Sequence, residues 1–273
     1  MLARLFSFLC GKSPRLRRAL WRAWYNFLGG RFRQDNWTFM NYGYAPLDDD
    51  EPVPELAEAQ ERDRTCIQLY DHLARAVPLA GKRVVEVGSG RGGGCAWVHR
   101  RHAPRATRGV DFSGEAVALC RRRHRLPGLS FVRGDAEHLP LPDARVDAVL
   151  NVESSHCYGS RQRFYAEAAR VLRPGGHFLY ADFFSAEQLR DARRWLADAG
   201  FETLVERNIT PNVLRAMDHD HDWKRAEIRR MLPGFIAGAF EQFAGLKDSE
   251  IYESFRTGQL AYTSWVLRKS GGG

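Results

Sequence analysis

Short apolar runs alternate with amphipathic segments of helical length along much of this chain. Four runs rich in β-branched residues predict strands; they begin at Val84, Arg108, Leu129 and Val146. The segments between and after them have apolar positions at helical spacing: Cys95–His102, Gly114–Arg125 and Gln162–Leu172. This alternation indicates an α/β fold with a parallel sheet and helices on both faces.

The pattern continues towards the C-terminus. His177–Phe183 predicts a fifth strand, and Ser185 with Gln188 forms a capping-box start for a helix that ends at Gly200. Phe201–Asn208 and Leu260–Arg268 predict two further strands at the C-terminal edge of the sheet. Because ligands of such sheets bind at the carboxyl ends of the strands, candidate chemistry is sought there.

A glycine-rich turn follows the first predicted strand. Its candidate ligand-binding residues are Glu86, Gly88, Ser89, Gly90 and Gly92. Glycines in alternation let the backbone turn with positive φ and approach a ligand closely. Glycine-rich turns also occur in ordinary surface loops. The residues at the ends of the next strands therefore distinguish a ligand-binding turn from such a loop.

Acidic residues follow the next strands. Asp111, beside Phe112, comes about 20 residues after the glycine turn, a spacing at which a carboxylate accepts both ribose hydroxyls. As an alternative, Asp111 caps the helix that begins near Gly114. Asp135 and the Ala136 amide are placed to contact a base edge, or else form an ordinary turn.

The order of these pieces resembles the class I S-adenosylmethionine-dependent methyltransferases from about Lys82 to Phe183, and more weakly to Arg268. Within that class it is most similar to the phthiotriol and phenolphthiotriol dimycocerosate methyltransferases and the fatty-acid O-methyltransferases. The segments that carry the likeness are Cys120–Leu129, Phe131–Glu137, Asn151–Tyr158 and Val171–Gly176.

The resemblance implies a Rossmann-like, mostly parallel sheet with an antiparallel edge strand and helical lids, and S-adenosyl-L-methionine as the cofactor. Asn151 at the end of the fourth strand joins the cofactor residues. We expect a basic arm with lid helices at residues 1–80, and a methyltransferase domain at 81–270 with a helical lid insertion at about 209–258.

Methyl transfer to an oxygen needs a base, because the acceptor must lose a proton. His156 lies just past the fourth strand, and imidazole titrates near neutral pH, so His156 is the candidate base. It could instead hydrogen-bond the substrate or a carboxylate. Glu153 is placed to orient His156 if residues 153–157 form a helical turn, or it caps that turn.

Tyr42 and Tyr44 belong to a segment, Asn41–Tyr44, that resembles the lid over the methionine end of the cofactor in small-molecule members of the class. An aromatic ring beside a sulfonium gives cation–π stabilisation. The alternative is that both rings pack a loop against the body.

Apolar residues in the two expected lids favour a largely apolar acceptor, such as a lipid, polyketide or terpenoid. They are Phe32, Trp37, Phe39 and Met40 before the body, and Met231, Phe235, Ile236, Phe240 and Phe243 in the insertion. We expect methylation of a hydroxyl; carbon methylation of a prenyl, sterol or other natural-product acceptor is the alternative. A nucleic-acid acceptor is disfavoured, because Asn151–Ser154 lacks the Pro-Pro-aromatic segment of base methyltransferases.

The net charge of +8 comes from one end of the chain. Residues 1–34 contain eight Lys or Arg and no acid, and the remainder has 33 residues of each sign. Leu16, Leu20, Trp24 and Phe27 recur at helical spacing, which predicts a basic amphipathic helix in the arm. Two interpretations remain open: a peripheral membrane contact, or a lid or homo-oligomer contact.

Five cysteines without a C-x-x-C pair predict neither a zinc site nor disulfides, which fits the cytoplasm. No apolar run approaches the roughly 20 residues that cross a bilayer. His219–Asp222 could bind a metal, but we expect a polar loop before a helix starting near Trp223, and no metal site.

Overall fold

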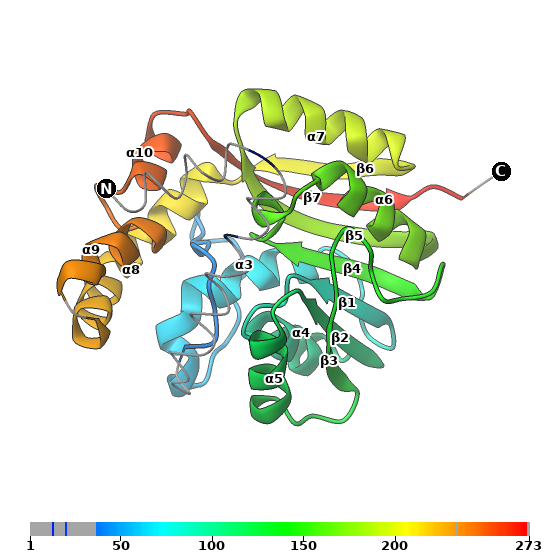
Figure 1. The fold of residues 1–273 in the computed structure, drawn as a ribbon, viewed down its shortest axis with the longest axis horizontal. Helices are drawn as coiled ribbons and strands as arrows, with labels where there is room; N and C mark the ends of the chain where they lie inside the picture. The colour runs from blue at the N-terminus through cyan, green and yellow to red at the C-terminus, as the bar shows by residue number, and fades with distance from the viewer. Residues whose placement is uncertain (1–12, 14–19, 21–36, 233, 272–273) are drawn as a thin grey trace.

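The computed structural model describes residues 13, 20, 37–232 and 234–271 (Figure 1). Apart from Leu20, the apolar positions assigned to the basic arm lie outside the described residues, as do Phe32 and the side chains of Phe235 and Ile236.

Seven strands form one sheet in the order β3-β2-β1-β4-β5-β7-β6. The strands are β1 (Arg83–Val87), β2 (Ala106–Asp111), β3 (Leu129–Arg133), β4 (Val146–Val152), β5 (Leu172–Phe184), β6 (Phe201–Asn208) and β7 (Ala261–Lys269). Strands β1 to β5 pair in parallel, whereas β7 runs antiparallel to both β5 and β6. The predicted α/β fold, mostly parallel with antiparallel pairing at one edge, is confirmed.

Helices cover both faces of the sheet. They are η1 (Glu58–Asp63), α3 (Arg64–Ala74), α4 (Gly93–His102), α5 (Gly114–Arg123), η2 (Ser155–Cys157), α6 (Arg161–Val171), α7 (Ala186–Asp198), α8 (Thr210–Met231), α9 (Gly234–Phe243) and α10 (Glu250–Arg256). Alternate side chains of β1 enter different cores: Val85 packs with α6 and α7, and Val84 packs with α3, α4 and α8. The period of two in a strand therefore builds both layers.

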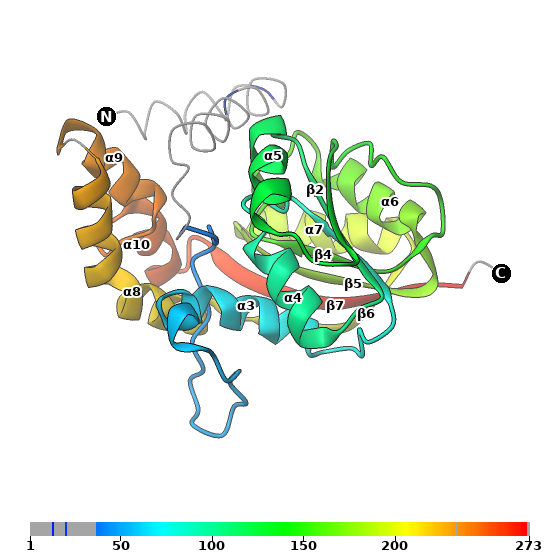
Figure 2. The ribbon, with the colours of Figure 1, turned by 90° about the horizontal axis from the view of Figure 1, so that it is seen from below.

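Helices α8, α9 and α10 gather beyond one end of the strands in both views (Figures 1 and 2). They form an insertion between β6 and β7, and its two ends meet at the sheet. The Ile209 amide donates to the Tyr262 carbonyl at 2.8 Å, and the Tyr262 amide donates to Thr210 Oγ1 at 2.8 Å. No helix in the described part of the chain is both long and apolar enough to span a bilayer.

The prediction of a polar loop at His219–Asp222 is wrong, because these residues lie inside α8. Asp220 is buried, accepts a hydrogen bond from Thr65 Oγ1 at 2.6 Å, and pairs with Lys224 Nζ at 3.1 Å. The hydrogen bond from Thr65 ties α8 to α3, and the pair with Lys224 lies within α8. Across the described residues, no group of three metal-type ligands occurs.

Candidate active site

The glycine turn after β1 forms the floor of a cavity at the carboxyl ends of the strands. Gly88 (φ +75°) and Gly90 (φ +50°) both have positive φ. A Cβ at Gly88 would lie 2.4 Å from Ser154 Oγ, so no larger residue fits there. Ser89 also lines this cavity, and its buried Oγ has no hydrogen-bond partner in the described part of the chain.

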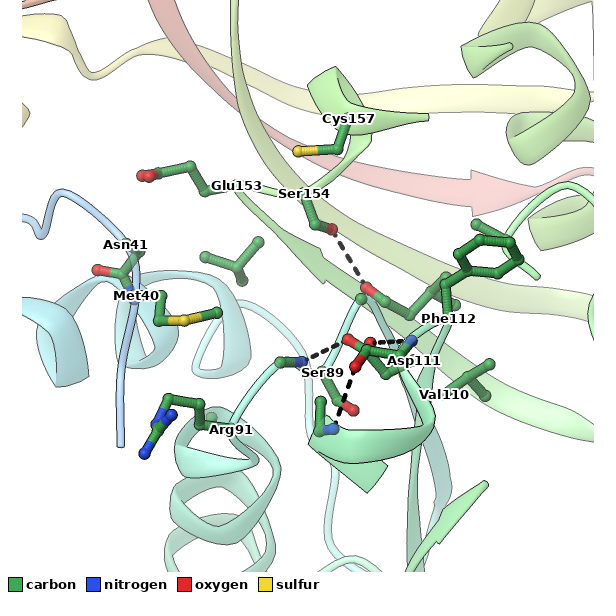
Figure 3. Close-up of a pocket in the computed structure, with 18 of the residues that line it drawn as sticks. Met40, Asn41, Ser89, Arg91, Val110, Asp111, Phe112, Glu153, Ser154 and Cys157 are labelled. Atoms are coloured by element: carbon green, nitrogen blue, oxygen red, sulfur yellow. Dashed lines mark hydrogen bonds between the residues drawn. The ribbon is translucent and has the colours of Figure 1, made fainter. Parts of the chain in front are cut away.

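Asp111 closes the next strand and lies on the same side of the cavity as Ser89 (Figure 3). Its two carboxylate oxygens accept hydrogen bonds from the Gly90 and Ser113 amides, each at 2.8 Å. Burial raises the pKa of Asp111 to about 6, although both amides act to lower it. The alternative cap role belongs instead to Ser113, whose hydroxyl accepts from the Ala116 amide at the start of α5.

Phe112, Asp135 and Ala136 line the cavity beside Asp111, as the sequence predicts. Carboxylate, hydroxyl and backbone groups thus meet an apolar surface in one cleft at a sheet edge. Several further lining residues were not anticipated as cofactor residues: Tyr70, Arg91, Glu137, Ser154, Cys157 and Tyr158.

Three predicted cofactor residues lie beneath the cavity without lining it. Glu86 is buried and accepts from the Tyr70 hydroxyl at 2.6 Å, and burial raises its pKa to about 7. Asn151 Nδ2 donates to the Val87 carbonyl at 2.8 Å and to Ser154 Oγ at 2.7 Å. Gly92 is the N-cap residue of α4. In this structure all three hold the glycine turn and its neighbours in place.

A second cavity adjoins the first, and the two share a wall made of Phe39, Met40, Asn41 and Glu153. Most of the second cavity is apolar and aromatic. That part is lined by Trp37, Tyr42, Trp223, Ile228, Met231, Leu232, Phe240, Phe243 and Ala244. Its polar lining includes Lys224, Glu153 and His156.

Glu153 stands at the junction of the two cavities, opposite Asp111 in Figure 3. Its backbone has φ +47°, a strained conformation for a residue with a side chain. Glu153 Oε2 accepts from the Tyr42 amide and from the Tyr262 hydroxyl, both at 2.9 Å. Burial raises the pKa of Glu153 to about 8, so its carboxyl group is mostly protonated at neutral pH.

His156 lines the second cavity and is oriented by Asp182, not by Glu153 as the sequence analysis expected. His156 Nδ1 is 3.0 Å from Asp182 Oδ1, and the His156 amide also donates to Asp182 at 3.1 Å. Residues Ser155–Cys157 do form a helical turn, but Glu153 precedes it and its amide donates to the Ala181 carbonyl. The carboxyl end of β5 therefore supplies the orienting acid.

The pKa values of His156 and Asp182 are shifted in opposite directions. Burial alone would lower the pKa of His156, but attraction to Cys157 and Asp182 raises it well above its ordinary value. Burial also opposes the Asp182 charge, yet His156 holds the pKa of Asp182 at about 2. A third group, Ser155 Oγ, donates to Asp182 at 2.5 Å. In the sequence, Asp182 could have been recognised as an acid near the end of the predicted strand His177–Phe183.

The two tyrosines of the Asn41–Tyr44 segment have different surroundings. Tyr42 lines the second cavity, and its amide holds Glu153. Tyr44 lies away from both cavities, stacks on His72 at 4.6 Å, and donates its hydroxyl to Glu51 at 2.7 Å. The structure thus brings Tyr42 to the acceptor side of Glu153 and leaves Tyr44 in the packing of the body.

The sheet order and the cleft over Gly88, Asp111 and Asp135 define the class of S-adenosylmethionine-dependent methyltransferases. Residues 85–180 match the family model described as a methyltransferase domain. Among solved structures, the [4+2]-cyclase SpnF has a TM-score of 0.70 at 22% identity, covering 92% of this chain and 95% of that one. Geranyl diphosphate C-methyltransferase from Streptomyces coelicolor A3(2) gives 0.64 at 22% identity, covering 84% and 87%.

Curated relatives narrow the class. The phthiotriol/phenolphthiotriol dimycocerosates methyltransferase of Mycobacterium tuberculosis is 38% identical over 253 residues, 92% of this chain and 93% of that protein. The fatty-acid O-methyltransferase of Mycolicibacterium smegmatis is 38% identical over 246 residues, 90% and 88% of the two chains. The chain belongs to the methyltransferase family that includes these two enzymes, and S-adenosyl-L-methionine is its cofactor.

Proposed function

We propose that the protein transfers a methyl group to a hydroxyl of a largely apolar, lipid-like molecule. The observation that carries the proposal is the shared wall at Glu153, which joins a polar cavity suited to the cofactor with an aromatic cavity that contains His156. The names of the two mycobacterial relatives support a lipid-like acceptor.

The cofactor fits the residues of the first cavity. Asp111 would accept the ribose hydroxyls, since each carboxylate oxygen has a further lone pair beyond the amide it already holds. Ser89 Oγ offers an unused hydroxyl, and the Ala136 amide and Asp135 would contact the base. When bound, S-adenosylmethionine supplies a methyl group already activated on a sulfonium.

The second cavity would hold the acceptor and exclude water. Trp37, Ile228, Met231 and Phe240 offer apolar contact to an alkyl body. The polar groups Glu153 and His156 lie on the lining, so an amphiphilic acceptor would place its hydroxyl beside them. The protonated Glu153 adds no negative charge next to the acceptor oxygen.

His156 would act as the general base. Asp182 holds the Nδ1 side of the ring, which fixes the tautomer and stabilises the imidazolium that forms as the acceptor loses its proton. The pair raises the basicity of His156, and the base form is reached only above its raised pKa.

Carbon methylation is the second candidate. The aromatic rings of Trp37, Tyr42 and Trp223 line the acceptor cavity, and such faces stabilise a carbocation through cation–π contact. In that reaction His156 would remove a proton from carbon instead of oxygen. The two candidates differ in their products, since only hydroxyl methylation forms an ether.

The test is product analysis with long-chain alcohols as acceptors and radiolabelled S-adenosylmethionine, with nuclear magnetic resonance to locate the new methyl group. We expect an ether from the wild type. His156→Ala should lower turnover roughly 10²–10⁴-fold, the usual contribution of a general base, with cofactor affinity preserved. His177→Ala, within β5 and outside the lining of both cavities, is the matched control. Near-normal turnover in His156→Ala would show that His156 is not the general base. A carbon–methyl product would favour carbon methylation.

A further inference from the structure

Seven exposed arginines gather on the elements that lie on the β3 side of β1. They are Arg100 and Arg101 at the end of α4, Arg105 in the following loop, Arg108 on β2, Arg121 and Arg122 at the end of α5, and Arg125 before β3. We call this set the arginine face. The only acids in residues 99–128 are Asp111, which lies in the cofactor cavity, and Glu115 at the opposite end of α5.

None of these seven arginines forms an ion pair with another described residue. The contrast with many other exposed arginines of the body is clear. Arg173 pairs with Asp147 at 2.7 Å, Arg193 with Glu206 at 2.6 Å, and Arg256 with Glu253 at 2.6 Å. The charges of the arginine face are thus not neutralised by neighbouring acids.

Three members of the arginine face adjoin one another beside the edge strand β3. Arg108, Arg121 and Arg125 line one shallow surface cleft together with Ser130. Arg108 Nε donates to Ser130 Oγ at 3.4 Å, and Arg121 Nε donates to the Phe131 carbonyl at 2.9 Å, so these side chains are held at the surface. Figure 1 shows α4, β2, α5 and β3 as neighbours.

Two structural roles account for part of this charge. Arg121 and Arg122 lie in the last turn of α5, where positive charge offsets the helix dipole. Charge beside the edge strand β3 also discourages pairing with another chain. Neither role explains Arg105 and Arg125, which lie in loops outside the helices, nor the absence of acids around all seven.

We propose that the arginine face docks the protein on an anionic lipid surface. Nucleic acid is the less suitable partner, because no aromatic side chain is exposed in residues 99–133 for bases to stack on. The choice of a lipid surface also rests on the proposed lipid-like acceptor.

One residue at the end of α5 contacts a wall of the acceptor cavity. Arg123 Nη1 of α5 donates to the Trp37 carbonyl at 3.0 Å, and Trp37 lines that cavity. Docking through α5 therefore brings a wall of the acceptor cavity near the lipid phase.

The experiment measures co-sedimentation of the full chain with vesicles of phosphatidylglycerol and phosphatidylcholine, and with vesicles of phosphatidylcholine alone. The face variant is Arg108→Gln, Arg121→Gln and Arg125→Gln combined. The control variant, Arg145→Gln, Arg190→Gln and Arg215→Gln, removes the same charge from exposed positions elsewhere. An arm variant combines Arg15→Gln, Arg18→Gln and Arg22→Gln. Circular dichroism and cofactor titration verify that each variant folds.

We expect the wild type to bind only the anionic vesicles and to be released by high salt. The face variant should bind them about 100-fold more weakly, from the contribution of three basic side chains near such a surface. The control variant should bind like the wild type. Equal binding by the face and control variants would overturn the proposal, as would loss of binding in the arm variant alone.

Two further measurements separate this proposal from neighbouring ones. Methyl transfer to a detergent-dispersed alcohol should be unchanged in the face variant, so loss of vesicle binding does not bear on the proposed reaction. A single-stranded oligonucleotide serves as the competing probe. If the wild type binds the oligonucleotide tightly, ignores the vesicles, and loses the oligonucleotide in the face variant, the partner is a nucleic acid and the proposal is wrong.

Discussion

Replacing Asp182 by Asn tests the proposed base directly. Asp182 is fully buried, and its carboxylate contacts His156 Nδ1, the His156 amide and Ser155 Oγ. Asn keeps the shape and an oxygen acceptor but removes the negative charge. The imidazolium of His156 then loses the Asp182 carboxylate, so the pKa of His156 should fall towards its ordinary value.

The size of the effect follows from the carboxyl group of the pair. Its pKa lies at about 2 instead of 3.8 although burial opposes the charge, and His156 is the largest of the contributions that lower it. A hydrogen bond between charged groups contributes about 1.5–3 kcal/mol, or roughly 1–2 pKa units. A general base works in its neutral form, so wild-type kcat/KM should rise with pH through the raised pKa of His156. In Asp182→Asn this rise should move to lower pH by roughly 1–2 units, with a plateau roughly 10–100-fold lower because the forming imidazolium has lost that charged hydrogen bond.

The assay is kcat/KM for transfer to a long-chain alcohol across a range of pH, with cofactor binding followed separately. Asp147→Asn is a matched control, since Asp147 pairs with Arg173 near the start of β4 and does not contact His156. A pH profile of Asp182→Asn that keeps the wild-type midpoint, with only a lower plateau, would refute the assignment of His156 as the titrating base.

Three further predictions follow from the site. Asp111→Asn should weaken cofactor binding by about 1–3 kcal/mol in isothermal titration, and wild-type affinity should itself fall as pH drops below about 6, because protonated Asp111 accepts hydrogen bonds poorly; unchanged affinity would contradict the ribose role. Glu153→Gln should stabilise the fold increasingly between about pH 5 and pH 8, by up to about 4 kcal/mol in urea unfolding. The folded carboxyl group has a pKa of about 8 against an ordinary 4.5, so wild-type stability falls with rising pH over that range, and a pH-independent difference would count against it. Removal of residues 1–34 should leave cofactor binding intact; a changed sedimentation mass or acceptor KM would identify an oligomer or lid contact, and loss of vesicle binding a membrane contact.

The sheet and the cofactor cleft could be anticipated because their signals are local. The β-branched runs that end at Gly88 and at Asp111 predict two strands and also show which residues follow each strand end. Buried parallel strands bring those ends to one edge, so seven predicted residues line a single cavity: Gly88, Ser89, Gly90, Asp111, Phe112, Asp135 and Ala136.

The partner of His156 could not be read in the same way. Glu153 is close to His156 in sequence, whereas Asp182 comes to it only through the pairing of β4 with β5, in which Val152 lies opposite Ala181. Non-local register decides which acid reaches the imidazole. The placement of His219–Asp222 within α8 was missed for a similar reason, because Thr65 and Lys224 satisfy Asp220 within a helix that the polar pattern did not predict.

The insertion of α8–α10 begins and ends at adjacent points of the sheet, where Ile209 and Thr210 hydrogen-bond to Tyr262. A segment whose ends abut can be lengthened, shortened or exchanged without altering the strands on either side. This insertion supplies Trp223, Ile228, Met231 and Phe240 to the proposed acceptor cavity and none of the described residues that line the first cavity. Acceptor choice can therefore diverge among relatives by replacement of one module, while the sheet and its cofactor chemistry are inherited unchanged.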